Sequence, residues 1–366
     1  MKNESDSKHT RVRRRAIATL VLAAAVALLG LAMDRRLNRL PPSLGFDVPR
    51  PSPSAVLPTT YGELSALETD QIDGCDIALL NLLCAEGLPN AECVDVQASL
   101  AVLDAWARRV KSETQRHLDR FQKNPREFEH SEGYFRMLMM AVVFHEDYQV
   151  RYNPERIANL ERAAMGDGFF VDSRDVFLHG LFGSRRMGTC SSMPVLYVAL
   201  GRRLGYPLKL VTTKGHLFVR WESSTERFNV DATGEGMNRY DDDYYRHWPF
   251  PLTEAEIIEH GYLKSLSSAE ELAVFLSIRG QCLMEAGRYA EAVTSLEHAV
   301  RLRPGSPDEK LLLAQAWAKR DGFVEPQPSI SRAAAAASTQ FTQPIGIRYA
   351  TGSEFVPDPN PLLQFR

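Results

Sequence analysis

The sequence has little excess charge of either sign, because 43 lysines and arginines stand against 46 aspartates and glutamates, for a net charge of −3. A basic surface of the kind that binds nucleic acid is therefore not expected, and we predict no nucleic-acid partner. Glycine motifs that bind phosphate are also absent, which leaves ATP chemistry without support.

Cysteine is scarce as well, with five in 366 residues. Cys75, Cys84 and Cys93 follow one another at a spacing that matches no zinc motif, so we expect no metal and no cofactor. In an oxidising compartment two of these three could form a disulfide, and the sequence does not say which two. Cys190 and Cys282 stand apart from them.

Long hydrophobic runs are limited to residues 16–33, an uncharged stretch just long enough to span a bilayer. More lysine and arginine precede this run than follow it closely, which directs the C-terminal bulk across the membrane. We therefore predict a bacterial-type protein anchored in the inner membrane, with its bulk extracytoplasmic. Gly30-Leu31-Ala32 also fits a cleavage site, so a cleaved signal peptide and a secreted or periplasmic protein stay open as the alternative.

The pattern of apolar residues predicts an α+β fold. Two amphipathic helices are expected between Gly74 and Glu113, and another helix over residues 133–145. The segments LKLVTT, HLFVRW and RFNVD alternate with a period of two, which is typical of antiparallel strands. The predicted parts are an anchor at 1–36, a proline- and serine-rich linker at 37–62, a main domain at 63–265, repeat-like helices at 266–320 and a mostly disordered tail at 321–366.

The helices after the main domain fit one tetratricopeptide repeat. Its small, aromatic and helix-breaking positions are occupied by Gly280, Gly287, Tyr289, Ala292, Leu296, Ala299 and Pro304. Residues 307–319 resemble the first helix of a second repeat. One complete repeat does not make the long concave surface of a solenoid. Two interpretations stay open: a helical hairpin packed on the main domain, and a module that docks a protein partner.

Cys190 precedes a stretch, VLYVALGRRLGYP, whose apolar spacing predicts a buried helix. Pro194 belongs in the first turn, where a missing N–H costs nothing, so the helix must begin close to Cys190. The free N–H groups and positive end of a helix favour a thiolate, which is the nucleophilic form of cysteine. The alternative is a small buried cysteine, with Thr189 as a helix cap.

A nucleophilic cysteine needs a base and a group that orients the base. If KGHLFVRW and ERFNVDAT pair as a hairpin with Glu222–Thr225 as the loop, His216 faces Asp231 and Arg220 faces Arg227. The other face of this hairpin is apolar and should pack on the Cys190 helix. The Arg220–Arg227 pair places like charges together, which indicates a splayed end.

These segments, GTCSSMPVLYVALGRRLGYPLKLV, KGHLFVRW and FNVDAT, resemble the core of the transglutaminase-like superfamily. The upstream helices are similar to its SirB-like bacterial branch, whose members often carry tetratricopeptide repeats; the likeness covers roughly residues 70–305. It implies a papain-like core, with a cysteine-bearing helix packed on an antiparallel sheet. It also implies Cys190 as nucleophile, His216 as general base and acid, and Asp231 as the orienting carboxylate.

The sequence departs from the better-known enzymes of that superfamily in two places. Asp231 is followed by Ala-Thr instead of Pro-Thr, and no upstream Gln or Trp stands out as a second oxyanion donor. His179 is a candidate for that role, against a purely structural one. Residues 239–251, RYDDDYYRHWPFP, are interpreted either as a wall of a substrate cleft or as a packed loop.

Two functional hypotheses follow. The first is a cysteine hydrolase or acyltransferase acting on a protein or peptide amide or ester. The second is an inactive scaffold that holds protein partners through the repeat-like helices.

Overall fold

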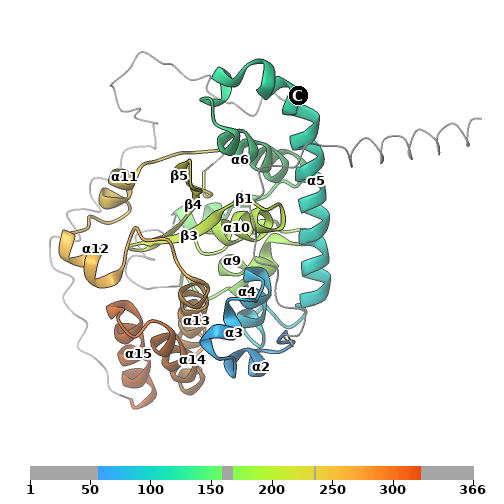
Figure 1. Ribbon diagram of the computed structural model, residues 1–366. Helices are drawn as coiled ribbons and strands as arrows, with labels where there is room; N and C mark the ends of the chain where they lie inside the picture. Colours follow the sequence, from blue (N-terminus) through green and yellow to red (C-terminus); the bar gives the residue numbers. More distant parts are fainter. Residues whose placement is uncertain (1–56, 159–167, 235, 323–366) are drawn as a thin grey trace, which may run out of the picture. The chain divides into compact units, whose positions relative to one another are not determined.

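The computed structural model describes residues 57–158, 168–234 and 236–322 (Figure 1). The predicted membrane run at 16–33, the linker before residue 57 and the tail from residue 323 lie outside these ranges. Within the described part of the chain, no helix combines the length and the apolar character needed to cross a membrane. The described chain mixes helices with a small sheet.

The first half of the described chain is helical. The helix pair predicted between Gly74 and Glu113 is present as α4 (Ile77–Ala85) and α5 (Val96–Lys123). Each begins at an aspartate, Asp76 or Asp95, whose carboxylate accepts a hydrogen bond from a backbone N–H of the first turn. The helix predicted over residues 133–145 is α6 (Glu132–Val142), extended by a π-helical turn at Val143–Asp147.

Shorter elements lie between these helices and the strands. They are α2 (Tyr61–Ser65), α3 (Thr69–Ile72), the 3-10 turns Pro125–Phe128 and Leu178–Leu181, α7 (Pro154–Ala158), α9 (Ser173–Val176), α11 (Asp242–His247) and α12 (Glu254–His260).

The predicted antiparallel sheet is present as β3 (Leu208–Thr213), β4 (His216–Glu222) and β5 (Arg227–Val230), in the order β3-β4-β5. The register predicted for the β4–β5 hairpin is wrong by two residues. Arg220 pairs with Asn229 and Glu222 with Arg227, so the loop is Ser223–Glu226. An even shift keeps every side chain on its predicted face. It also replaces the like-charge pair with Glu222 and Arg227, whose charged groups lie 3.4 Å apart.

A second, parallel pairing was not predicted from the sequence. The short strand β1 (Arg151–Tyr152) lies beside β2 (Met187–Gly188), which leads directly to Cys190. Two residues are too few to show an alternating pattern, so no periodicity marks either strand.

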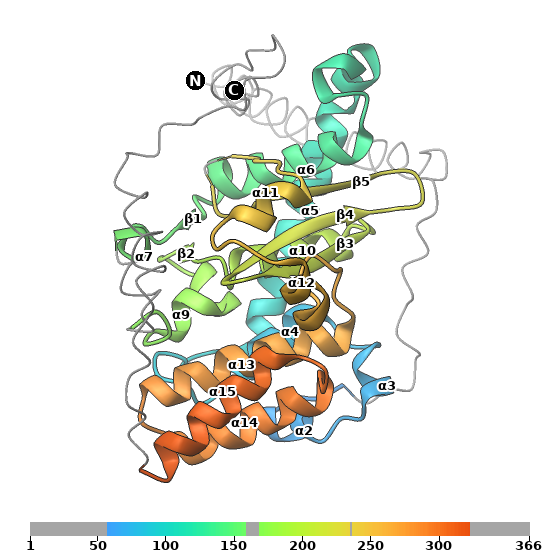
Figure 2. The same cartoon turned by 90° about the vertical axis from the view of Figure 1, so that its left-hand side faces the viewer.

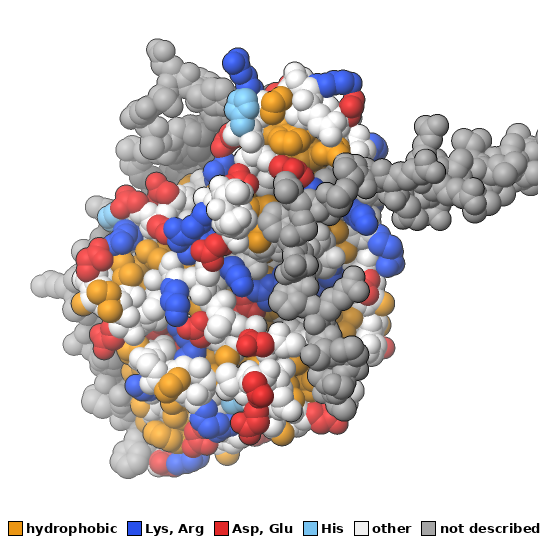
Figure 3. All heavy atoms as spheres, viewed as in Figure 1, with side chains coloured by type: hydrophobic (Ala, Val, Ile, Leu, Met, Phe, Trp, Pro, Cys, Tyr) orange, Lys and Arg blue, Asp and Glu red, His pale blue; other side chains and the backbone are white. Residues whose placement is uncertain are grey.

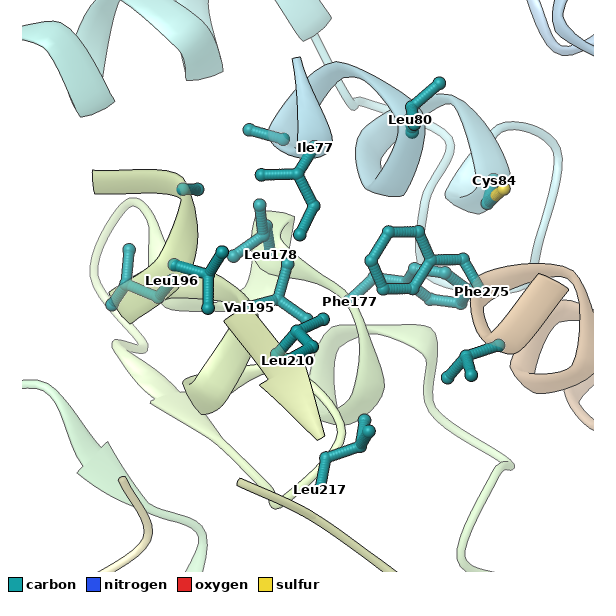
Figure 4. Packing of buried hydrophobic residues seen from close by; sticks show 14 of the residues in the cluster. Ile77, Leu80, Cys84, Phe177, Leu178, Val195, Leu196, Leu210, Leu217 and Phe275 are labelled. Carbon is teal, nitrogen blue, oxygen red and sulfur yellow. The ribbon is translucent and has the colours of Figure 1, made fainter. Parts of the chain in front are cut away.

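The helix predicted after Cys190 is α10 (Met193–Arg203), with Pro194 in its first turn. Every side chain from Met193 to Leu200 is buried, which places α10 inside the core. The apolar face of the sheet packs on it, as predicted. Figure 4 shows Val195 and Leu196 of α10 near Leu210 of β3, with Ile77 of α4 close by. Burial of each such side chain contributes about 1.5–3 kcal/mol.

The C-terminal helices are α13 (Ser268–Glu285), α14 (Tyr289–Leu302) and α15 (Pro307–Arg320), which pack on one another in turn (Figure 2). A side chain at Gly280 of α13 would overlap Leu296 of α14, so glycine permits their close approach. Arg279 joins α13 to the end of α4 because its guanidinium donates to the carbonyls of Cys84 and Glu86. The helices α13, α14 and α15 therefore share one apolar core with α4, α10 and the α10-facing side of the sheet.

Candidate active site

Cys190 lies in a tight turn between β2 and α10. The N–H of Met193 donates to the carbonyl of Thr189 at 3.0 Å, so helical hydrogen bonding already includes Cys190, although the regular helix begins at Met193. Thr189, Ser191 and Ser192 are buried, whereas Cys190 is partly exposed. The turn thus fixes its neighbours in the protein and leaves the thiol accessible.

Asp175 holds the turn around Cys190 in place through hydrogen bonds. Its backbone carbonyl accepts the hydroxyls of Thr189 at 3.0 Å and Ser192 at 2.8 Å. Its fully buried carboxylate accepts hydrogen bonds from Asn153, Arg156 and Arg185. A buried carboxylate is tolerated only when it is paired in this way. Asp175 was not identified from the sequence, because its partners lie on separate segments.

His216 and Asp231 meet on the face of the sheet opposite α10. His216 is the first residue of β4, and its Nε2 lies 2.9 Å from Oδ2 of Asp231, which directly follows β5. Both side chains are buried. The two-residue register shift makes them diagonal neighbours instead of a directly opposed pair, and they remain within hydrogen-bond reach.

The second interaction of His216 is with Cys190. Burial alone would lower the pKa of the imidazole, but its hydrogen bonds to Asp231 and Cys190, with the charges of both groups, raise this pKa from 6.5 to about 9. Because Nε2 bonds Asp231, Nδ1 is the nitrogen left to face the thiol. The structure therefore brings Cys190, His216 and Asp231 together in that order.

Two further residues hold the Asp231 carboxylate, and neither was named as a site residue from the sequence. The N–H of Thr233 donates to Oδ1 at 2.9 Å, and the hydroxyl of Tyr245 lies 3.3 Å from Oδ2. Burial opposes the charge of Asp231, but the hydrogen bonds from His216 and Thr233 outweigh it and lower the carboxyl pKa. The Asp-Ala-Thr run is the one sequence signal for this contact, since a hydroxyl residue two positions after an aspartate readily closes such a turn.

The segment at residues 239–251 contains the helix α11 and packs on the sheet mainly through Tyr245. Tyr245 is buried and stacks on Phe218 with ring centroids 3.8 Å apart. Trp248 meets the His216 ring edge-on at 4.7 Å and so helps to exclude water from the histidine. Asp242 binds the buried Arg220, which explains why an arginine lies inside the sheet. Phe250 is 40% exposed and packs beside Gly215, next to His216.

The contacts of His179 are with residues other than Cys190, His216 and Asp231. Its Nε2 is 3.3 Å from the Ser173 hydroxyl, and burial lowers its pKa to about 4, so the ring is neutral. The charged groups that act on it are Asp172, Arg174 and Arg185. None of these contacts is with Cys190, His216 or Asp231.

Tyr152 lies beside Cys190 instead. Its strand β1 pairs with β2 so that Tyr152 is opposite Gly188. Burial raises the pKa of its phenol, and an interaction with the Cys190 backbone opposes that shift. No sequence signal marks this residue.

All five cysteines are free thiols, so none of Cys75, Cys84 and Cys93 is joined in a disulfide. Burial raises the pKa of Cys84 and of Cys282 to about 12, which makes both unreactive. Among the residues that the structure describes, no group of three or more His, Cys, Asp and Glu is arranged to hold a metal ion.

Residues 97–249 match the family model of the transglutaminase-like superfamily. This transglutaminase-like domain runs from α5 through the segment that covers His216, and it contains Cys190, His216 and Asp231. Searches of curated proteins and of solved structures found no match. The matched domain ends before α13.

Proposed function

We propose that the chain is a membrane-anchored, extracytoplasmic cysteine enzyme that attacks an amide or ester of a protein or peptide and forms an acyl-cysteine. The observation that carries the proposal is the hydrogen-bonded sequence Cys190, His216, Asp231 inside a transglutaminase-like domain. This is the arrangement of nucleophile, base and orienting carboxylate that thiol catalysis requires.

The proposed reaction has two halves. The Cys190 thiolate attacks the carbonyl carbon, a C–S bond forms, and the bond to the leaving amine or alcohol breaks as the His216 imidazolium gives that group its proton. His216, now neutral, then takes a proton from water or from an amine as it attacks the acyl-cysteine. Water gives hydrolysis and an amine gives acyl transfer, and both restore the thiolate and the imidazolium.

Asp231 keeps the imidazole oriented throughout and stabilises its charged form. The raised pKa of His216 means that the ring is protonated at neutral pH, which is the state that the leaving group needs. Papain-like organisation of this core, membership of the SirB-like branch, and the tetratricopeptide nature of α13–α15 form part of the same proposal. The anchor is residues 16–33.

A first prediction follows for the intact protein. On incubation with p-nitrophenyl acetate, which transfers acetyl to reactive thiols, one acetyl group should be found on Cys190 by peptide mass spectrometry after rapid acid quenching. Cys93 is exposed and serves as the internal reference for an ordinary thiol. Cys190→Ser should accumulate no such thioester, and faster labelling of Cys93 than of Cys190 in the native protein would refute the proposal.

The alternative is an inactive transglutaminase-like scaffold. The observation that favours it is the last helix, α15, where Leu311 is 60% and Trp317 41% exposed, as on a surface that docks a partner. If Cys190→Ala keeps the full biological effect while Leu311 and Trp317 changed to serine abolish it, the scaffold is the better account.

A further inference from the structure

The backbone N–H of Cys190 donates to no backbone carbonyl among the described residues, so it is available to stabilise a developing oxyanion next to the thiol. A tetrahedral intermediate on a cysteine normally needs a second donor, aimed at the same oxygen. The residue best placed to supply it is Tyr152.

Tyr152 is fixed relative to the Cys190 turn by main-chain bonds on both sides. The N–H of Arg151 donates to the carbonyl of Arg186 at 3.0 Å, and the N–H of Asn153 donates to that of Gly188 at 2.8 Å. Between these bonds Tyr152 stands opposite Gly188, two residues before Cys190. Strand pairing thus sets the distance from the tyrosine to the cysteine turn.

Side chains fix the same two segments a second time. The amide of Asn153 donates to the carboxylate of Asp175 at 2.9 Å, and the Asp175 carbonyl receives the hydroxyls of Thr189 and Ser192. One buried residue therefore links both strands that flank the site. A donor held in this way costs little reorganisation when charge develops on the substrate.

Tyr152 stands close to the Cys190 backbone. Burial, with the negative charges of Cys190, Asp175 and Asp231, holds the pKa of Tyr152 well above its ordinary value. The Cys190 backbone acts in the opposite direction and lowers this pKa, as an N–H directed at the phenol oxygen does. The hydroxyl keeps its proton, and it can donate.

We propose that Tyr152 is the second oxyanion donor of the acyl-transfer reaction, acting together with the backbone N–H of Cys190. The inference rests on the acyl-cysteine mechanism proposed above. Two neighbouring donors can both reach one oxygen that lies about 3 Å from each. In this arrangement the substrate carbonyl oxygen lies between the Tyr152 hydroxyl and the Cys190 N–H and receives both hydrogen bonds.

The step involves no proton transfer from Tyr152. As the thiolate attacks, the C=O electron pair moves onto oxygen, and the O–H of Tyr152 and the N–H of Cys190 stabilise that charge. The pair returns to re-form the carbonyl as the leaving group departs with the proton of His216. Loss of one such donor slows acylation by about 10²- to 10³-fold.

The test compares two reagents on the full-length protein. Iodoacetamide alkylates the thiolate at a saturated carbon and forms no oxyanion, whereas p-nitrophenyl acetate acylates it through one. In Tyr152→Phe we expect the acylation of Cys190 to slow by about 10²-fold or more while its alkylation stays within about twofold of the native rate. Unchanged alkylation also shows that the variant is folded around the thiol. Tyr148→Phe, four residues away with its ring stacked on Trp106, is the matched control and should leave both rates unchanged.

The remaining outcomes separate this inference from the proposed function. Acylation of the native protein with equal acylation of Tyr152→Phe would overturn the role of Tyr152 alone. Equal losses of acylation and alkylation would also overturn it, because Tyr152 would then act on the thiolate and not on the oxyanion. No acylation of Cys190 in the native protein would overturn the proposed function, and the inference with it.

Discussion

His216→Ala should slow the acylation of Cys190 by about 10²- to 10⁴-fold, the usual contribution of a positioned acid–base group. In the native site the imidazole contacts the thiol and carries a proton at neutral pH, because Asp231 and Cys190 raise its pKa to about 9. Without it, Cys190 has no neighbouring base to take its proton. Stopped-flow release of p-nitrophenol, with mass spectrometry of Cys190, measures the effect.

The matched control is His247→Ala. His247 is on α11, exposed, and bonded through Nδ1 to the backbone carbonyl of Asp243. Its removal deletes a histidine of the same region without touching Cys190, and the acylation rate should stay within about twofold of the native rate. Similar rates for native protein and His216→Ala would show that His216 has no role in activating the cysteine.

Asp231→Asn should lower turnover of an amide substrate by about 10²- to 10⁴-fold and also change its dependence on pH. The native carboxylate holds the His216 pKa high, so activity that needs the imidazolium should decline only as the pH rises through about 9. A neutral asparagine removes the attractive charge of Asp231, while burial continues to lower the pKa of His216. The decline should therefore move to lower pH.

Initial rates measured from pH 5 to 10 give both parts of this result. Thr212→Val is a suitable control, since Thr212 lies on the neighbouring strand β3 and its hydroxyl is not part of the contacts to Asp231. If Asp231→Asn loses rate with no movement of the alkaline limb, the carboxylate orients His216 but does not set its protonation.

Much of this site could be predicted from the sequence because the signals are local. Pro194 and the spacing of Leu196 and Leu200 fixed the start and the buried face of α10. The alternation of His216, Phe218 and Arg220 assigned those side chains to one face of β4. Register is not local, since alternation is unchanged by a shift of two residues. The predicted pairing of Arg220 with Arg227 was the sequence evidence against that register, and the observed pairing of Arg227 with Glu222 removes this repulsion.

The parts that could not be predicted depend on contacts between distant segments. Tyr152 is placed beside the Cys190 turn by a two-residue strand pair, and the Asp175 carboxylate binds partners from two segments, Asn153 and Arg156 on one and Arg185 on the other. Neither leaves a periodic pattern or a recognisable spacing. Tyr245 and Trp248 fell within a segment interpreted mainly as packing, and they do pack, but they do so on Asp231 and His216. In this segment the same side chains both pack on the sheet and contact the candidate catalytic residues.

His216 is proposed to activate Cys190 as a nucleophile, and alkylation at pH 6 tests this proposal most directly. At that pH an ordinary thiol is almost wholly protonated, whereas a thiolate held by a protonated histidine remains reactive. With limiting iodoacetamide and the native full-length protein, Cys190 should be labelled at least about tenfold faster than the exposed Cys93. In His216→Ala the two cysteines should be labelled at similar rates. Labelling of Cys190 no faster than Cys93 at pH 6 would contradict the account.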